Sequence, residues 1–212
     1  MSCCSNDQKF DGTSVAYRRA LWAVILINLV MFAVEITAGF ASGSQALKAD
    51  ALDFAGDTMT YTISLLVIGS SLALRARAAL FKGGLLIVIA VSVLGMTLMR
   101  ALSGEPPVAE TMGIVGFAAL LANAASVLIL LKWRDGDANV RSVWLCSRND
   151  AIGNVGVMIA GGLVAITGSA WPDLILAFAL AALFTRSAWF ICTQALDELR
   201  RHNHAIAEAG DA

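Results

Sequence analysis

Six long apolar segments, separated by short polar connections, dominate this sequence of 212 residues. They cover approximately residues 20–40, 46–74, 80–102, 108–132, 143–167 and 172–193. Each is close to the length of about 20 residues that an α-helix needs to cross the hydrocarbon core of a bilayer. The connections contain helix-breaking sequences, such as Ser-Gly-Ser at 42–44 and Gly-Glu-Pro-Pro at 104–107. We therefore expect an all-α, polytopic membrane protein with six transmembrane helices.

The composition agrees with a membrane-embedded bundle. Hydrophobic residues make up 58% of the chain and the mean hydropathy is +0.73, whereas soluble domains average about 45–50% apolar residues. The net charge of −1 provides no basic surface for nucleic acid, so the expected surroundings are the lipids of the cell membrane. We expect an N-terminal tail over residues 1–17, a membrane domain over 18–193 and a short C-terminal tail over 194–212.

The distribution of Lys and Arg predicts the orientation of the chain. If the N-terminus is cytoplasmic, only Lys48 and Arg100 lie near the outer face. The cytoplasmic side then receives most of the basic residues: Lys9, Arg18, Arg19, Arg75, Arg77, Lys132, Arg134, Arg141, Arg200 and Arg201. Because cytoplasmic connections of membrane proteins carry an excess of Lys and Arg, both termini are expected in the cytoplasm.

Four potential metal ligands lie within the apolar segments. Asp53 and Asp57 are four residues apart in the second segment, and Cys146 and Asp150 have the same spacing in the fifth. Residues at i and i+4 share one face of an α-helix. Ionisable groups inside a bilayer are costly unless they face a partner, a cavity or an ion. Three carboxylates and one thiolate could therefore form a tetrahedral site for a divalent cation.

The two pairs are expected at similar depths in the membrane. At the helical rise per residue, Asp53 lies about 12 Å and Asp57 about 18 Å from the outer start of their helix. Cys146 lies about one turn from the inner end of its helix, and Asp150 about 6 Å deeper. Antiparallel packing would place Asp57 near Cys146 and Asp53 near Asp150, close to the middle of the bilayer. The alternative is that these are isolated polar packing residues.

The types of ligand indicate which ions the site would take. Cysteine favours softer ions such as Zn²⁺ or Cd²⁺, whereas oxygen ligands alone would favour Mg²⁺, Ca²⁺ or Mn²⁺. All four groups must be deprotonated to bind a metal, so metal and protons compete for them. A site that exchanges metal for protons would support antiport. The metal ion and the proton are then substrates, and no cofactor is expected.

Four further polar residues extend these helix faces. Glu35 and Asn28 share a face of the first helix, where Glu35 could serve an exit or proton path or could reach lipid headgroups as an interfacial acid. Asn154 could hydrogen-bond a ligand carboxylate from one turn further along the fifth helix, or simply pack against another helix. Asp50 could relay metal or protons, although such a residue more often faces water at the mouth of a cavity.

Both tails also contain potential metal ligands. Cys3 and Cys4 lie near the N-terminus, and His202 and His204 lie near the C-terminus. Terminal segments are usually poorly ordered, so we interpret these residues as secondary to the four ligands within the membrane.

Two stretches of sequence resemble the cation diffusion facilitator family of metal transporters. In that family a Gly-Ser turn leads into an Ala-Asp-Ala run, a His or Asp, three residues and an Asp, which is similar to SGSQALKADALDFAGD at 42–57. The sequence CSRNDAIGN at 146–154 is similar to the matching His-x-x-x-Asp segment of the fifth helix. With six spans, inner termini and short outer turns, the resemblance covers nearly the whole chain.

The resemblance implies export of Zn²⁺ or a related divalent ion from the cytoplasm in exchange for protons. It also implies a homodimer and alternating access between inward-open and outward-open states. Most members carry a cytoplasmic metal-binding domain after the sixth helix, so we interpret this chain as a short form that lacks it. Cys146 stands where the family usually has His, which predicts a shift toward Cd²⁺ or another thiophilic ion.

Other classes of protein compete with this interpretation. A membrane metal sensor or accessory protein would hold the ion without moving it, but a sensor normally needs an output domain. The same transporter fold could instead move Co²⁺, Ni²⁺, Hg²⁺ or Fe²⁺. An intramembrane thiol enzyme using Cys146 is disfavoured because no His lies in any expected span to activate the thiol. We therefore expect a heavy-metal efflux transporter rather than an enzyme.

Overall fold

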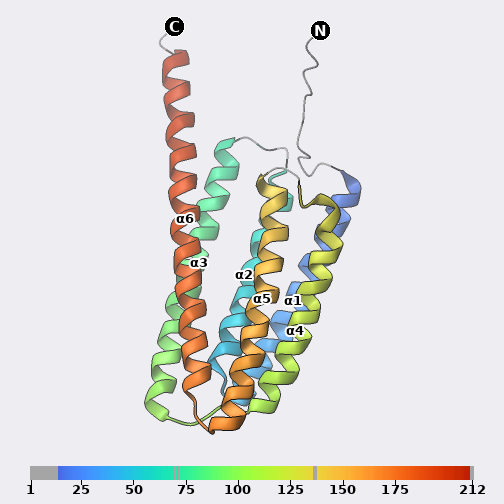
Figure 1. The fold of residues 1–212 in the computed structure, drawn as a ribbon. Coiled ribbons are helices and arrows are strands. Elements are labelled where there is room, and N and C mark those ends of the chain that lie inside the picture. Colours follow the sequence, from blue (N-terminus) through green and yellow to red (C-terminus); the bar gives the residue numbers. More distant parts are fainter. Residues whose placement is uncertain (1–13, 69, 71, 136–137, 211–212) are drawn as a thin grey trace, which may run out of the picture.

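Long helices run side by side and antiparallel through the whole molecule (Figure 1). The structure is a computed structural model that describes residues 14–68, 70, 72–135 and 138–210. Its elements are α1 Val15–Ser42, α2 Gln45–Leu66, α3 Leu72–Ser103, α4 Ala109–Leu130, the 3₁₀ helix η1 Leu131–Trp133, α5 Ala138–Thr167 and α6 Trp171–Gly210. No strand occurs in these residues, so the predicted all-α class is confirmed for the described chain.

Five helical stretches of the described residues are long and apolar enough to cross a membrane: Val15–Ser42, Ala76–Ser103, Ala109–Trp133, Cys146–Thr167 and Trp171–Asp197. The exception is α2, whose 22 residues include Lys48, Asp50, Asp53 and Asp57. At about 33 Å, α2 is nevertheless as long as a membrane span, and it packs against α1, α3 and α6. The start of α1 and the end of α6 lie at the same end of the bundle (Figure 1).

The six α-helices form two groups. Helices α1, α2, α4 and α5 pack as a bundle, while α3 and α6 make the most extensive helix–helix contact and lie along α2. One apolar cluster holds the bundle together, with Tyr17, Leu21, Val24, Tyr61, Leu130 and Val143 at its centre. Another joins the pair to α2, with Ala49, Ile89, Ala90, Val93, Ala177, Ala181 and Phe184 at its centre.

A short turn determines where α2 begins. Gly43 has a φ of 77°, in the left-handed region that favours glycine after the end of a helix. Ser44 is the N-cap of α2, and its Oγ accepts a hydrogen bond from the backbone N–H of Leu47 at 3.0 Å. This turn therefore sets the register from which the aspartates of α2 are counted.

The boundary between the second and third helices differs from the prediction. Helix α2 ends at Leu66 rather than near Leu74, and α3 begins at Leu72 rather than near Leu80. The backbone N–H of Ser70 donates to the carbonyl oxygen of Val67 at 3.0 Å, which turns the chain here. The prediction ran through residues 69–71, Gly-Ser-Ser, because the apolar residues on either side hid this helix-breaking sequence.

The predicted tails are described only in part. The helix α6 continues to Gly210, so the polar residues after 193 extend the sixth helix up to that point. Cys3 and Cys4 lie outside the described residues, and so do the side chains of His202 and His204. The possible metal ligands in the tails therefore stay predictions.

Candidate metal site

A small hollow inside the four-helix bundle is lined almost entirely by polar side chains. The six polar side chains come from four helices: Asp50, Asp53 and Asp57 of α2, Asp150 of α5, Asn28 of α1 and Asn123 of α4. The empty space amounts to about 140 Å³ and is too narrow for a water molecule. A hollow with acidic and amide walls in an apolar bundle is suited to a cation rather than to an organic ligand.

Three of the four predicted metal ligands line this hollow together. Asp150 of α5 lies within interaction range of both Asp53 and Asp57 of α2, and all three side chains are half-buried. Cys146 interacts most strongly with Asp57, but it is exposed and does not line the hollow. This placement is consistent with the expected antiparallel pairing, and the role of the four residues as ligands stays a prediction.

The carboxylates are not yet in the geometry of a bound metal. Among the described residues, no three His, Cys, Asp or Glu side chains converge closely enough to hold a metal ion. Asp150 lies within hydrogen-bond range of both Asp53 and Asp57, which two carboxyl groups allow when one of them holds a proton, and the hydroxyl of Tyr61 donates a hydrogen bond to Oδ2 of Asp57. A tetrahedral Zn²⁺ site needs oxygen ligands at about 2.0–2.2 Å. Binding would therefore require these side chains to move toward one another.

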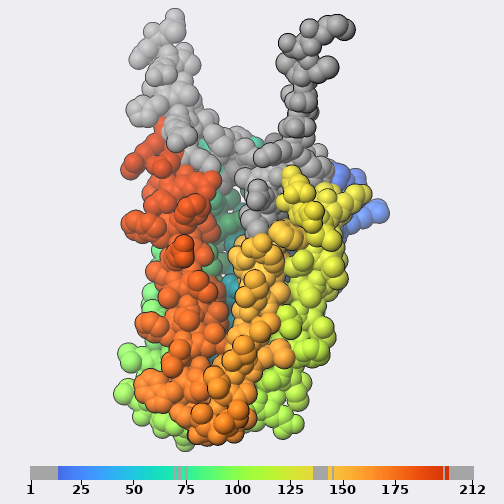
Figure 2. Space-filling view, viewed as in Figure 1, coloured from blue at the N-terminus to red at the C-terminus, as the bar shows by residue number. Residues whose placement is uncertain are grey.

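A groove lies between α5 and α6 on the face of the molecule shown in Figure 2. Figure 2 shows it as a furrow beside α6, with the colours of α2 and α3 visible at its floor.

Lys82 of α3 is half-buried, interacts with Cys146 and Asp57, and donates from Nζ to Oγ of Ser64 at 2.7 Å. Sequence reasoning missed Lys82, although a basic residue within the third apolar segment was a usable signal.

The structure corrects two expectations about the neighbouring acids. Glu35 is completely buried, so the alternative in which it reaches lipid headgroups is wrong. Its carboxyl group lies within hydrogen-bond range of the carboxyl group of Asp50, and two acids this close can share one proton. Asp50 is only 4% exposed and lines the hollow. The expectation that Asp50 faces water is therefore also wrong, because α1 covers this face of α2.

The two predicted asparagines have different surroundings. Asn28 lines the hollow, and its Nδ2 donates to the carbonyl oxygen of Val24 at 2.8 Å. Asn154 is buried but does not line the hollow, and its amide has no hydrogen-bond partner. The predicted hydrogen bond from Asn154 to a ligand carboxylate is therefore not formed.

A buried aspartate that sequence reasoning missed holds the start of α2 against α6. Asp173 is 1% exposed. Its Oδ1 accepts hydrogen bonds from Oγ of Ser44 at 2.5 Å and from the N–H of Ala46 at 3.0 Å, and its Oδ2 accepts from the N–H of Gln45 at 2.7 Å. A carboxylate at a helix N-terminus satisfies free N–H groups and opposes the positive end of the helix dipole. Asp173 thus fixes the helix that carries three of the acids.

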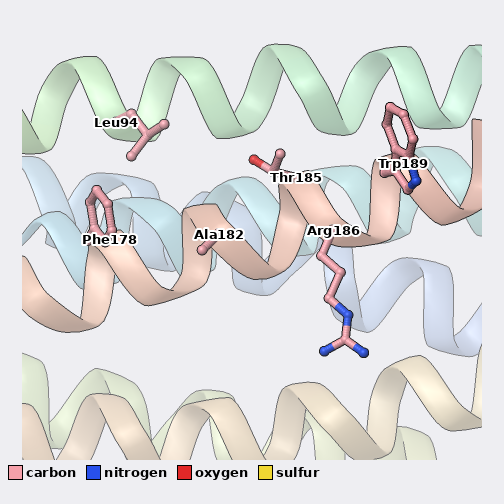
Figure 3. A pocket seen from close by; sticks show the side chains of 6 residues that line it. All are labelled: Leu94, Phe178, Ala182, Thr185, Arg186 and Trp189. Atoms are coloured by element: carbon pink, nitrogen blue, oxygen red, sulfur yellow. The ribbon is translucent and has the colours of Figure 1, made fainter.

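A larger groove lies between α3 and α6 and has a different character. Its volume is about 490 Å³ and its lining is Leu94, Phe178, Ala182, Thr185, Arg186 and Trp189. No acid is among these residues, and Arg186 points away from α3 (Figure 3). The smaller hollow is therefore the better candidate for a cation site.

Comparison with known proteins gives consistent results. Residues 21–200 match the cation efflux transmembrane domain. The chain is 31% identical to the zinc transporter ZitB of Escherichia coli (strain K12), over 86% of this chain and 62% of that protein. It is 26% identical to the metal cation efflux system protein CzcD of Cupriavidus metallidurans, over 85% of this chain and 61% of that protein. It is 27% identical to the cadmium, cobalt and zinc/H(+)-K(+) antiporter of Bacillus subtilis (strain 168), over 78% of this chain and 59% of that protein.

The matched region includes every residue of the hollow. The chain spans slightly less than two thirds of the length of these relatives, 62% for the Escherichia coli protein. Its apolar helices and its relatives make it a multi-pass protein of the cell membrane. The resemblance seen in residues 42–57 and 146–154 is thereby confirmed, and the chain belongs to the cation diffusion facilitator family.

Proposed function

We propose that this protein exports a divalent heavy-metal ion, Zn²⁺ or Cd²⁺, from the cytoplasm in exchange for protons. One observation carries the proposal: Asp53, Asp57 and Asp150 lie on two helices and line a single hollow in a chain of a metal-efflux family. Relatives that are named as zinc, cadmium and cobalt transporters support this choice of ions. A membrane sensor or accessory protein would also explain the acids in the hollow. It would not explain why the chain matches a family of efflux transporters.

Each residue has a distinct part in the proposed transport cycle. The ion enters along the groove between α5 and α6 and meets the exposed Cys146 first. The three carboxylates then close around it to complete a tetrahedral site, which releases the protons they held. After a change to the outward-open state, protons from outside compete for the same groups and displace the ion.

Two parts of the proposal rest on other observations. The direction of transport rests on the positive-inside orientation, which places the start of α1 and the end of α6 in the cytoplasm. A homodimer is proposed from the family resemblance alone, since the structure contains a single chain. Neither is needed for the assignment of the hollow as the cation site.

Transport into proteoliposomes under a pH gradient tests the function directly. The uptake of Zn²⁺, Cd²⁺, Co²⁺ and Mn²⁺ would be compared, with a pH-sensitive dye reporting the counterflow of protons. We expect Asp57→Ala and Asp150→Ala to abolish flux, because each removes one of the ligands. Asp197→Ala, an exposed aspartate on α6 outside the hollow, is the matched control and should retain flux. Normal transport by both site variants would refute the four-ligand site.

The contribution of the thiol can be tested separately. Cys146→His should shift preference from Cd²⁺ toward Zn²⁺, because imidazole is a harder ligand than thiolate. An unchanged ratio of the two fluxes would contradict the role of Cys146 in selectivity while leaving transport in place. Metal binding without flux in any ion gradient would instead favour the accessory-protein alternative.

A further inference from the structure

Asn123 is a polar residue whose side chain is buried inside the helix bundle. It lies on α4 with its side chain 1% exposed, and neither Nδ2 nor Oδ1 has a hydrogen-bond partner. Leaving a buried amide unpaired is unfavourable, so such a group calls for a specific reason. Asn123 lines the same hollow as Asp50 and Asp53, which places a neutral oxygen donor beside two carboxylates.

The other groups around this part of the hollow also supply oxygen. Asp50 is 4% exposed, and its carboxyl group lines the hollow within hydrogen-bond range of Glu35. Asn28 lines the hollow from α1, and its Nδ2 is already bonded to the backbone of its own helix. That bond leaves the carbonyl oxygen of the Asn28 amide for another partner. Together with Asn123 and Asp53, these residues offer four oxygen donors from three helices.

This oxygen set is displaced along α2 from the sulfur ligand. Asp50 lies seven residues before Asp57, which corresponds to about 10 Å along the helix toward the end where α2 begins. Cys146 lies within interaction range of Asp57, Asp150 and Asp53, and it does not line the hollow. The hollow thus has an oxygen-only end that the thiol does not share.

We propose that Asn123, Asn28, Asp50 and Asp53 form a second cation position, made only of oxygen donors, next to the site that contains Cys146. The inference rests on the proposed transport of metal ions and adds a step to it. An ion leaving the thiolate passes to harder ligands, which hold soft ions such as Cd²⁺ less tightly. Asp53 belongs to both positions and passes the ion between them, while Asn123 makes the second position able to take hard ions such as Mn²⁺.

The chain contains a matched control for Asn123. Asn154 is the same type of residue, is 0% exposed and also has an amide without a hydrogen-bond partner. It lies on α5 and does not line the hollow. Replacing each asparagine by leucine removes a buried amide and keeps the number of side-chain heavy atoms, so a general effect of the exchange on a buried amide position would appear in both variants.

The test measures two ions on the intact chain in detergent micelles. Binding of Mn²⁺ is followed by the loss of the electron paramagnetic resonance signal of the free ion, and binding of Cd²⁺ by ultraviolet absorption of the cadmium–thiolate bond. We expect Asn123→Leu to weaken Mn²⁺ binding by about tenfold or more, with the cadmium–thiolate absorption retained. Asn154→Leu should change Mn²⁺ affinity by less than about twofold.

A second variant keeps the proposal testable if Asn123→Leu does not fold. Asn123→Asp retains an oxygen donor and should bind Mn²⁺ at least as tightly as the unmodified protein. The proposal is overturned if Asn123→Asp loses Mn²⁺ binding, or if both leucine variants weaken it equally. Failure of the proposed function has a different signature, namely no cadmium–thiolate absorption and no flux in the unmodified protein.

Discussion

The four-helix bundle and the α3–α6 pair carry charges of opposite sign in their central turns. In the bundle the charges that line the hollow or are buried beside it are acidic, namely Glu35, Asp50, Asp53, Asp57 and Asp150, while Arg148 of α5 is exposed. In the pair they are basic, with Lys82 on α3 and Arg186 on α6. Acids that converge on a hollow attract a cation, whereas basic groups beside them reduce the repulsion among those acids. The comparison therefore favours the bundle for the proposed cation site, with Lys82 of the pair as a positive charge close to Asp57 and Cys146.

The two groups of helices also differ in how their helices meet. In the pair, α3 and α6 approach closely at Gly83, where a Cβ would lie only 2.3 Å from Sγ of Cys192, although a groove of about 490 Å³ opens elsewhere along them. In the bundle, the buried amides of Asn123 and Asn154 lack hydrogen-bond partners. The close contact of the pair is thus local to the turn around Gly83, whereas the bundle buries unpaired amides.

Removing one mid-membrane charge from each group should give the largest contrast. Asp150→Asn keeps the shape of the side chain but removes the charge of a proposed ligand, and we expect Cd²⁺ uptake to fall by at least about 100-fold. Arg186→Gln removes an exposed charge outside the hollow and should change uptake by less than about threefold. Initial uptake rates in proteoliposomes measure both. An equally severe loss in the two variants would contradict the assignment of cargo to the bundle.

The next largest effect is expected where the two groups meet. Asp173→Ala removes a buried carboxylate that accepts three hydrogen bonds at the start of α2, and should lower the free energy of unfolding by about 2 kcal/mol. Asp173→Asn retains an acceptor oxygen and should cost less. Chemical unfolding in micelles measures the difference. Equal stability of Asp173→Ala and the unmodified protein would show that the contact does not hold the groups together.

The close packing of the pair predicts a smaller loss of stability. Gly83→Ala should cost about 1–2 kcal/mol of unfolding free energy because the new methyl group meets Cys192. Gly84→Ala is the matched control, since nothing lies within 4 Å of a Cβ at that position. Adding Cys192→Ala to the first variant should restore most of the loss. If both glycine variants behave alike, the tight contact is not a feature of the pair.

The smallest expected effect is electrostatic and crosses from the pair to the bundle. Lys82 interacts with Cys146 and Asp57, so Lys82→Gln should tighten Cd²⁺ binding by about threefold by removing a nearby positive charge. Ser64→Ala removes the hydrogen-bond acceptor of Lys82 but keeps the charge, and should leave the affinity unchanged. Competition titrations against a metal indicator resolve the two variants. Weaker binding by Lys82→Gln would mean that this lysine organises the ligands instead.

The positions of most helices were predictable, and the one clear error has a local cause. Length and hydropathy locate a span, but they do not show where an apolar stretch is divided. Residues 67–71 lie between α2 and α3, and the helix-breaking character of the sequence Gly-Ser-Ser at 69–71 was outweighed by the apolar residues around it. At Gly43, in contrast, polar flanking residues made the same kind of break easy to predict.

The candidate site was predictable only along individual helices. The i,i+4 spacing placed Asp53 with Asp57, because the helical repeat alone determines which residues share a face. It could not place Asn123 and Asp50 at the same hollow, since that arrangement depends on how α4 and α2 are rotated and packed. Asp173 shows the same limit, because the start of the helix that it caps lies 128 residues away in the sequence.

The amino-acid sequence by itself determined that the chain crosses a membrane in long helices, and that acids and a thiol lie on two of their faces. Both follow from hydrophobic length and helical periodicity, which are local properties. Only the tertiary structure decided which polar groups share the hollow and which do not. Helix packing places Asn123 and Asp50 beside the acids, buries Glu35 and leaves Cys146 exposed. The energy that selects this arrangement comes from contacts between helices distant in sequence, which no pattern within a single helix contains.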